Sequence, residues 1–265
     1  VRLRFMMKDA DLYSLKFHQP TEAQLKAEAE AKAKAAEEAK AAAEAKAKAA
    51  AEAKAAKAKA AAEAKAAAEA KAQAAIEAAV RKAAKKPTGE LTKADFEEVG
   101  NLRLDNYQLT DVKRLEKLTQ LRSLNLGLNN LTDVKGLEKF TLLKTLSLAR
   151  NKLTDVKGLE KLTQLEVLGL GSNQLTNVKG LEKLTQLRTL SLAGNKLTDV
   201  KGLENLTQLK SLNLGANQLT DVQGLEKLTQ LEMLNLQSNP DLTRTQIAEL
   251  QKALPKCNIA SNPTK

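Results

Sequence analysis

Aspartates recur at intervals of 22 residues in the second half of the chain, and this column is the arrangement best suited to chemistry. Its members are Asp111, Asp133, Asp155, Asp199 and Asp221. Carboxylates stacked at strand spacing, about 5 Å, could hold a row of calcium ions. Alternatively, each carboxylate caps a 3₁₀ turn that begins at the following valine. Asn177 fills the one gap in the column, and asparagine caps well but weakens a hard-cation site. The sequence therefore favours capping and predicts no metal and no cofactor.

Catalytic residues are scarce. The one histidine, His18, is far in sequence from the one cysteine, Cys257. Cys257 stands in a predicted closing strand, where a small buried apolar residue is expected. The sequence contains no glycine-rich phosphate loop and no Ser-His-Asp arrangement. We predict that the chain is not an enzyme.

Charge and composition limit the choice of partners. The formal net charge is +11, but 32 acidic residues are interleaved with 43 basic ones, and the chain has no tryptophan. Two tyrosines and four phenylalanines are too few for a surface on which bases stack. We interpret the excess charge as solubilising and predict no nucleic-acid partner. No run of 18 apolar residues occurs, so membrane insertion is not expected, and no signal peptide is visible.

Three segments with different compositions follow one another. Within residues 1–19, Val1, Leu3, Phe5 and Met7 alternate with Arg2, Arg4, Met6 and Lys8, and Asp9-Ala10 supplies turn residues before a second run at 12–17. This pattern predicts a β-hairpin. Because two strands alone are marginally stable, the hairpin would be the end of a larger sheet. It resembles the last hairpin of a lectin-like or laminin-G-like β-sandwich.

Residues 20–88 are almost wholly alanine, lysine and glutamate, which are strong helix formers. Thr21 and Gln24 have the spacing of a capping box, and Pro87 and Gly89 follow the run. The composition predicts a helix over residues 21–86, roughly 100 Å long at 1.5 Å per residue.

This predicted helix has no apolar side chain larger than alanine between Leu25 and Ile76, and therefore no coiled-coil seam. We interpret it as a monomeric, semi-rigid spacer. It resembles the alanine-lysine-glutamate stalk of the bacterial envelope protein TolA. Two alternatives are association through close alanine packing, and docking of the helix end on the next domain through Ile76 and Val80.

Residues 89–265 contain the frame L-x-x-L-x-L-x-x-N-x-L, which recurs every 22 residues. Its asparagines are Asn129, Asn151, Asn173, Asn195, Asn217 and Asn239. Such a period predicts an α/β solenoid whose repeats bury apolar side chains against their neighbours. The first repeat has Tyr107 in the asparagine position. We expect an N-terminal cap at 91–99, with Thr92 as N-cap, and a helix-and-strand cap at 243–260.

The frame, with Leu-Thr-Asp-Val-Lys-Gly-Leu-Glu-Lys-Leu after each strand, resembles the internalin-type class of bacterial leucine-rich repeats. The resemblance covers residues 99–242. It implies a parallel sheet on the concave side, 3₁₀ turns on the convex side, and a protein-binding role at or outside the bacterial surface. The asparagine amides would satisfy backbone groups in the turn after each strand. We interpret the columns of glutamate and lysine on the convex side as a solvated, inert surface.

A binding surface in this fold would lie on the concave strands, whose outward residues are small or polar in the regular repeats. A basic margin and two exposed apolar residues stand beside them. These candidate partner-binding residues are Arg122, Lys144, Arg150, Val167, Arg188, Lys210 and Met233. Glu166 and Glu232 interrupt the margin, which is either a solvated rim or a site for an acidic protein partner. We therefore predict a non-catalytic protein-recognition module on a helical spacer at a bacterial cell envelope. The alternative is a structural envelope spacer or cross-linker in which the helix is the working part.

Overall fold

The structure, a computed structural model, describes residues 20–262, and the hairpin predicted for 1–19 lies outside the described residues. Helix α1, Glu22–Ala83, contains 62 residues and is about 90 Å long at 1.5 Å per residue. Gln24 N donates to Thr21 Oγ1 at 3.4 Å, and Thr21 N donates to Gln24 Oε1 at 2.9 Å. The predicted long helix and its capping box are confirmed.

The helix ends three residues before the predicted end because Lys85 adopts a left-handed backbone conformation, with φ 53°. Lys86 N then donates to the carbonyl oxygen of Arg81 at 2.9 Å, as in a Schellman motif. The sequence gives little warning of this stop, since lysine is an ordinary helix former.

Residues 65–265 form one compact unit, and its boundary falls inside α1 rather than at residue 88, where the composition changes. Up to residue 71, every described side chain of α1 is exposed. Ile76 and Val80 are then buried, with 6% and 4% of their surface exposed, in the same cluster as Val99 and Leu102. The last turns of α1 therefore cover the first repeat, which confirms that Ile76 and Val80 dock the helix end.

The short helix α2, Lys93–Glu97, completes this N-terminal cap. Asp95 N donates to Thr92 Oγ1, and the Asp95 carboxylate accepts from Thr92 N at 2.6 Å, so the expected N-cap is present. Lys86 Nζ also lies 2.7 Å from Asp95 Oδ2. The hydrogen bonds from Lys86 and Thr92 lower the pKa of Asp95 to about 2.

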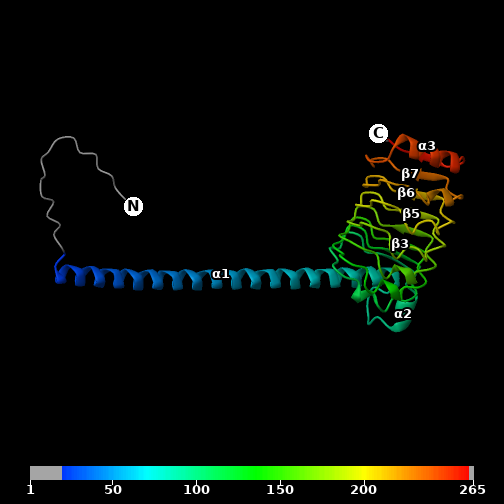
Figure 1. Cartoon of the computed structure of the whole chain (residues 1–265). Coiled ribbons are helices and arrows are strands. Elements are labelled where there is room, and N and C mark those ends of the chain that lie inside the picture. Colours follow the sequence, from blue (N-terminus) through cyan, green and yellow to red (C-terminus); the bar gives the residue numbers. More distant parts are fainter. Residues whose placement is uncertain (1–19, 263–265) are drawn as a thin grey trace, which may run out of the picture. The chain divides into compact units, whose positions relative to one another are not determined.

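Eight parallel strands follow in sequence order as a single sheet (Figure 1). They are β1 Asn101–Arg103, β2 Ser123–Asn125, β3 Thr145–Ser147, β4 Val167–Gly169, β5 Thr189–Ser191, β6 Ser211–Asn213, β7 Met233–Asn235 and β8 Asn258–Ala260. From β1 to β7 each residue pairs with the residue 22 positions later, for example Leu146 with Leu168. Short 3₁₀ helices lie between strands: η1 Lys113–Leu115, η2 Leu137–Lys139, η3 Leu159–Lys161 and η4 Leu225–Lys227. The predicted parallel solenoid is confirmed.

The C-terminal cap consists of α3, Arg244–Ala253, and strand β8. Thr243 caps α3 through a capping box with Gln246. Leu250 and Leu254 are buried, and so is Cys257, whose burial raises the pKa of its thiol. These elements close the last repeat and match the expected cap at 243–260.

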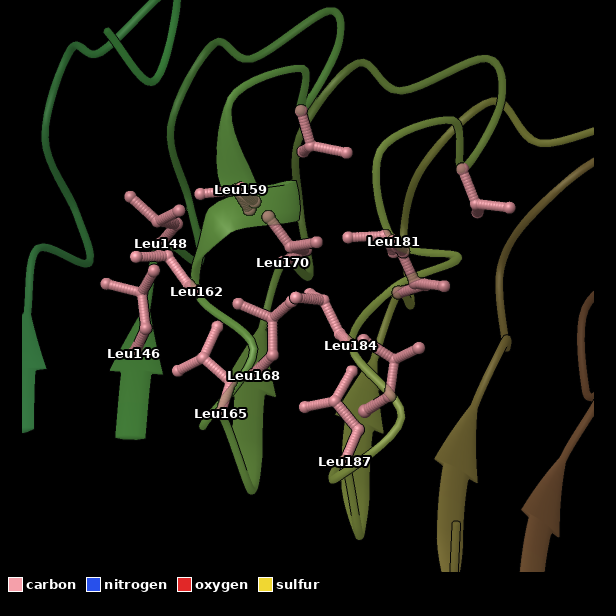
Figure 2. Packing of buried hydrophobic residues seen from close by; sticks show 14 of the residues in the cluster. Leu146, Leu148, Leu159, Leu162, Leu165, Leu168, Leu170, Leu181, Leu184 and Leu187 are labelled. Carbon is pink, nitrogen blue, oxygen red and sulfur yellow. The ribbon is translucent and has the colours of Figure 1, made fainter. Parts of the chain in front are cut away.

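Leucines from each coil point into one continuous core (Figure 2). Leu146, Leu168 and Leu190 occupy equivalent positions in successive strands and expose 1% of their surface each. Burying one such side chain stabilises the fold by about 1.5–3 kcal/mol. Because each coil contacts its neighbours, the stability of the arc is shared along the stack.

The repeated asparagines join neighbouring coils. Asn173 Oδ1 accepts from Leu153 N at 3.1 Å, and its Nδ2 donates to the carbonyl oxygens of Leu148 and Leu170 at 3.0 Å. Corresponding bonds recur at every asparagine of the frame, all of which are buried. The predicted role of these amides in satisfying the turn backbone is confirmed.

The residue before each asparagine of the frame, and before Tyr107 in the first repeat, has a left-handed backbone conformation. The sequence does not reveal this. The φ angles are 67° at Asn106, 57° at Leu128, 57° at Arg150, 56° at Ser172, 68° at Gly194, 54° at Ala216 and 59° at Ser238. Only one member of this column is glycine. We call it the left-handed column.

Candidate binding surface on the concave face

The concave floor is made of short side chains, and its asparagines bond to the backbone of their own turns. Asn125 Oδ1 accepts from Gly127 N at 3.0 Å, and Asn213 Oδ1 accepts from Gly215 N at 3.1 Å. At Gly171, a β-carbon would lie 3.3 Å from the carbonyl oxygen of Ala193. The floor is therefore smooth, with short side chains and a backbone that lies close beneath the surface.

The residues just before the strands form one column, which we call the edge column. It consists of Arg122, Lys144, Glu166, Arg188, Lys210 and Glu232. Backbone hydrogen bonds place them in register, because Lys144 N donates to Arg122 O at 2.8 Å and the same bond recurs from coil to coil. The structure thus brings four of the basic candidate residues into a single row.

Two of these four cations are neutralised by the glutamates that interrupt the row. Lys144 Nζ lies 2.8 Å from Glu166 Oε1, and Lys210 Nζ lies 2.9 Å from Glu232 Oε1. The hydrogen bond and charge of Lys144 lower the pKa of the Glu166 carboxyl, and the charge of Arg188 adds to this effect. Within residues 20–262, Arg122 and Arg188 make no side-chain hydrogen bond or salt bridge. These two arginines are therefore the edge-column cations without a hydrogen-bonded partner in this range, although Arg188 interacts with Glu166 through its charge.

The two apolar candidates stand in the adjacent column, on the strands themselves. Val167 pairs in register with Thr145 and Thr189, and Met233 pairs with Ser211. Their exposed fractions are 38% and 58%. Each directly follows a glutamate of the edge column, so both apolar side chains stand beside a neutralised ion pair.

Arg150 lies apart from the other candidates. It belongs to the left-handed column, beyond the C-terminal end of β3, whereas the edge column precedes the strands. Its backbone N donates to the carbonyl oxygen of Gly171 at 2.8 Å. Leu128, in the same column, is 47% exposed and was not singled out from the sequence, although a large apolar residue in a polar turn is a visible signal.

On the convex side, the aspartate column bonds to backbone. Asp133 Oδ1 accepts from Lys135 N at 3.0 Å, and Asn177 Oδ1 accepts from Lys179 N at 3.1 Å. Asparagine and aspartate therefore act alike, each binding the backbone N–H two residues later. The predicted capping of the 3₁₀ helices is wrong, because η2 begins at Leu137 after Gly136 and has no side-chain cap. In the described range 20–262, no group of three His, Cys, Asp or Glu residues could hold a metal ion.

The convex glutamates also have a structural role that the sequence did not suggest. Gly136, which precedes η2, has φ 94°, and its N–H donates to Glu138 Oε2 at 2.7 Å. The same bond is made to Glu160, Glu182, Glu204 and Glu226. Hydrogen bonds from backbone N–H groups lower the pKa of Glu160 and Glu204.

These features define a leucine-rich-repeat solenoid with helical caps. A family described as "Leucine Rich repeats (2 copies)" matches residues 141–183, 185–227 and 207–252, and "Leucine Rich repeat" matches residues 117–140. The chain belongs to the leucine-rich-repeat family, and its repeats resemble those of internalins. None of the curated proteins matches the chain.

Solved structures agree with this assignment. The chain resembles an internalin C2 of Listeria monocytogenes with 28% identity and a TM-score of 0.59, covering 72% of this chain and 92% of that one. It also resembles a leucine-rich-repeat protein of Leptospira interrogans, with 31% identity and a TM-score of 0.52. That match covers 64% of this chain and 51% of the other, about half its length.

No helix within residues 20–262 combines the length and the apolar character that crossing a bilayer requires.

Proposed function

We propose that the chain is a non-catalytic protein-recognition module that binds a protein partner through the concave face and its edge column. The observation that carries the proposal is that Arg122 and Arg188, within residues 20–262, make no side-chain hydrogen bond or salt bridge and stand beside a floor of small side chains. An exposed guanidinium is well suited to bind a carboxylate through two parallel hydrogen bonds. The preferred partner is therefore a protein with acidic groups that lies close to the floor.

We further propose that the repeats are displayed on α1 as a spacer at a bacterial cell envelope. The likeness to an internalin supports this setting. Residues of α1 up to 71 bury nothing in the described chain, so this part of the helix is suited to span distance as a monomer.

A charge-reversal experiment tests the binding face. The variant Arg122→Glu, Arg188→Glu, Lys210→Glu should lose capture of partners that the unaltered chain retrieves from bacterial envelope and host-cell extracts. A matched control is Lys113→Glu, Lys157→Glu, Lys201→Glu, which makes the same charge change on exposed convex positions. Equal capture by both variants, with binding retained, would refute the concave site.

The second candidate function is mechanical: α1 spans or cross-links envelope layers and the repeats anchor it. The exposed, alanine-rich surface of α1 favours this role. Deleting residues 27–62 removes ten turns, about 36 residues, and keeps the helical phase. A cellular phenotype that follows helix length and survives the concave-face substitutions would support the mechanical role over recognition.

A further inference from the structure

The concave surface contains the same three-coil arrangement twice. In the first copy, the free Arg122 is followed by the ion pair of Lys144 with Glu166 and then by the exposed Val167. In the second copy, Arg188 is followed by the pair of Lys210 with Glu232 and then by Met233. Each copy thus places one arginine that makes no hydrogen bond or salt bridge within residues 20–262 two coils before one exposed apolar side chain. We call these the two subsites.

The spacing of the groups limits the shape of the partner. Strands lie about 4.8 Å apart, so the cation and the apolar group of one subsite are about 10 Å apart along the stack. The two subsites are three coils, or about 14 Å, apart. A bound segment must present a carboxylate and an apolar group at these intervals on one face.

A helix meets this requirement better than an extended strand. Seven helical residues rise about 10.5 Å and eleven rise about 16.5 Å, and both intervals return to nearly the same face. A strand covers about 10 Å in three residues, which puts the two side chains on opposite faces. The remaining mismatch is about 2 Å at the second carboxylate and about 3 Å at the second apolar group, within the reach of arginine and methionine side chains.

We propose that the concave face binds an acidic amphipathic helix of a partner protein, with Arg122 and Arg188 pairing carboxylates and Val167 and Met233 contacting apolar side chains. The inference rests on the proposed recognition function and names its ligand class. The floor supports it, because Gly169 and Gly171 have no side chain and leave the backbone around β4 open to close approach. Helix α1 of a second copy has carboxylates but no apolar side chain larger than alanine between Leu25 and Ile76, so it does not fit.

The test uses two synthetic helical peptides in an alanine-glutamine background. The matching peptide has Glu at position i, Leu at i+7, Glu at i+11 and Leu at i+18. The control peptide has the same four residues on the same face in the order Glu, Glu, Leu, Leu. Circular dichroism checks that both are equally helical. Titration calorimetry with the full chain should show at least about tenfold tighter binding of the matching peptide, equivalent to about 1.4 kcal/mol.

Charge exchange then checks the register. Arg122→Glu should weaken binding of the matching peptide about tenfold. Changing the glutamate at position i of the peptide to lysine should restore binding to this variant, and the same change at i+11 should not. With Arg188→Glu the two peptide changes should exchange their effects. A peptide with the sequence of residues 27–62 should not bind.

Three results would overturn the inference. They are equal binding of the two peptides, no binding of the matching peptide at about 1 mM, and restored binding to an arginine variant by a Glu-to-Lys change at either peptide position. If partner capture is nevertheless lost in the charge-reversal triple variant, the recognition function stands and only the helical ligand class falls. If that triple variant retains capture, the concave face itself is refuted.

Discussion

Arg114 Nη1 donates a hydrogen bond of 2.8 Å to the backbone oxygen of Glu69, a residue 45 positions earlier in the chain. Arg114 belongs to η1 of the first repeat and Glu69 to α1, so the bond joins the helix end to the solenoid. It reinforces the burial of Ile76 and Val80 a few turns later. The last part of α1 is therefore the N-terminal cap that every solenoid needs to protect its end layer.

Replacing Ile76 with alanine should destabilise this cap by about 2–4 kcal/mol, because the buried side chain leaves a cavity against the first repeat. Hydrogen exchange should accelerate over residues 99–112 before the rest of the arc unfolds. Leu25→Ala is the matched control, since Leu25 is 52% exposed and should change nothing there. Equal exchange in both variants would show that the helix end does not stabilise the repeats.

Asp95 makes the cap sensitive to acid. Its pKa is lowered from 3.8 to about 2 by Lys86 and Thr92, so its contribution to stability is present above about pH 4 and is lost as the pH falls through 2. Asp95→Asn should lower the protection of α2 from hydrogen exchange at pH 7. The difference from the unaltered chain should shrink as the pH approaches 2. A difference that is constant with pH would show that the charge of Asp95 is not involved.

The period of 22 residues was sufficient to predict the parallel sheet and the asparagine bonds, because leucine and asparagine at fixed spacing leave one way to bury the apolar side chains. The two caps lie outside the regular repeats and were predicted from local signals such as the N-cap residue Thr92. The row of Arg122, Lys144, Arg188 and Lys210 also follows from that period. The ion pairs of Lys144 and Lys210 do not, since side-chain pairing between coils depends on rotamers. The separation of Arg150 from this row depends on how the chain turns after β3, which spacing alone does not fix.

Asn173 allows a sharp test of the asparagine bonds, since it lies in the central coils and makes three hydrogen bonds shorter than 3.2 Å to backbone groups. Asn173→Ala leaves those buried groups unpaired and should cost about 2–4 kcal/mol, at about 1–3 kcal/mol for each unsatisfied group with partial relaxation. Denaturant unfolding followed by thiol labelling of Cys257, the one cysteine, measures the loss. Asn130→Ala is the control, because Asn130 makes no side-chain hydrogen bond within residues 20–262. Its effect should stay within about 0.5 kcal/mol.

We expect opposite effects on stability from two substitutions in the left-handed column, Gly194→Ala and Ala216→Gly. Gly194→Ala adds a β-carbon no closer than 3.5 Å to Ser172, so space is available and only the backbone is strained. With φ 68° at this position, alanine should cost about 1 kcal/mol.

The reverse change, Ala216→Gly, relieves the strain of a left-handed alanine with φ 54°. Glycine also loses more chain entropy on folding, about 0.5–1 kcal/mol, so the net effect should be between neutral and a gain of about 1 kcal/mol. Thiol labelling of Cys257 in denaturant again gives both free energies of unfolding. Destabilisation by Ala216→Gly as large as that by Gly194→Ala would show that side-chain contacts, and not backbone conformation, decide stability in this column.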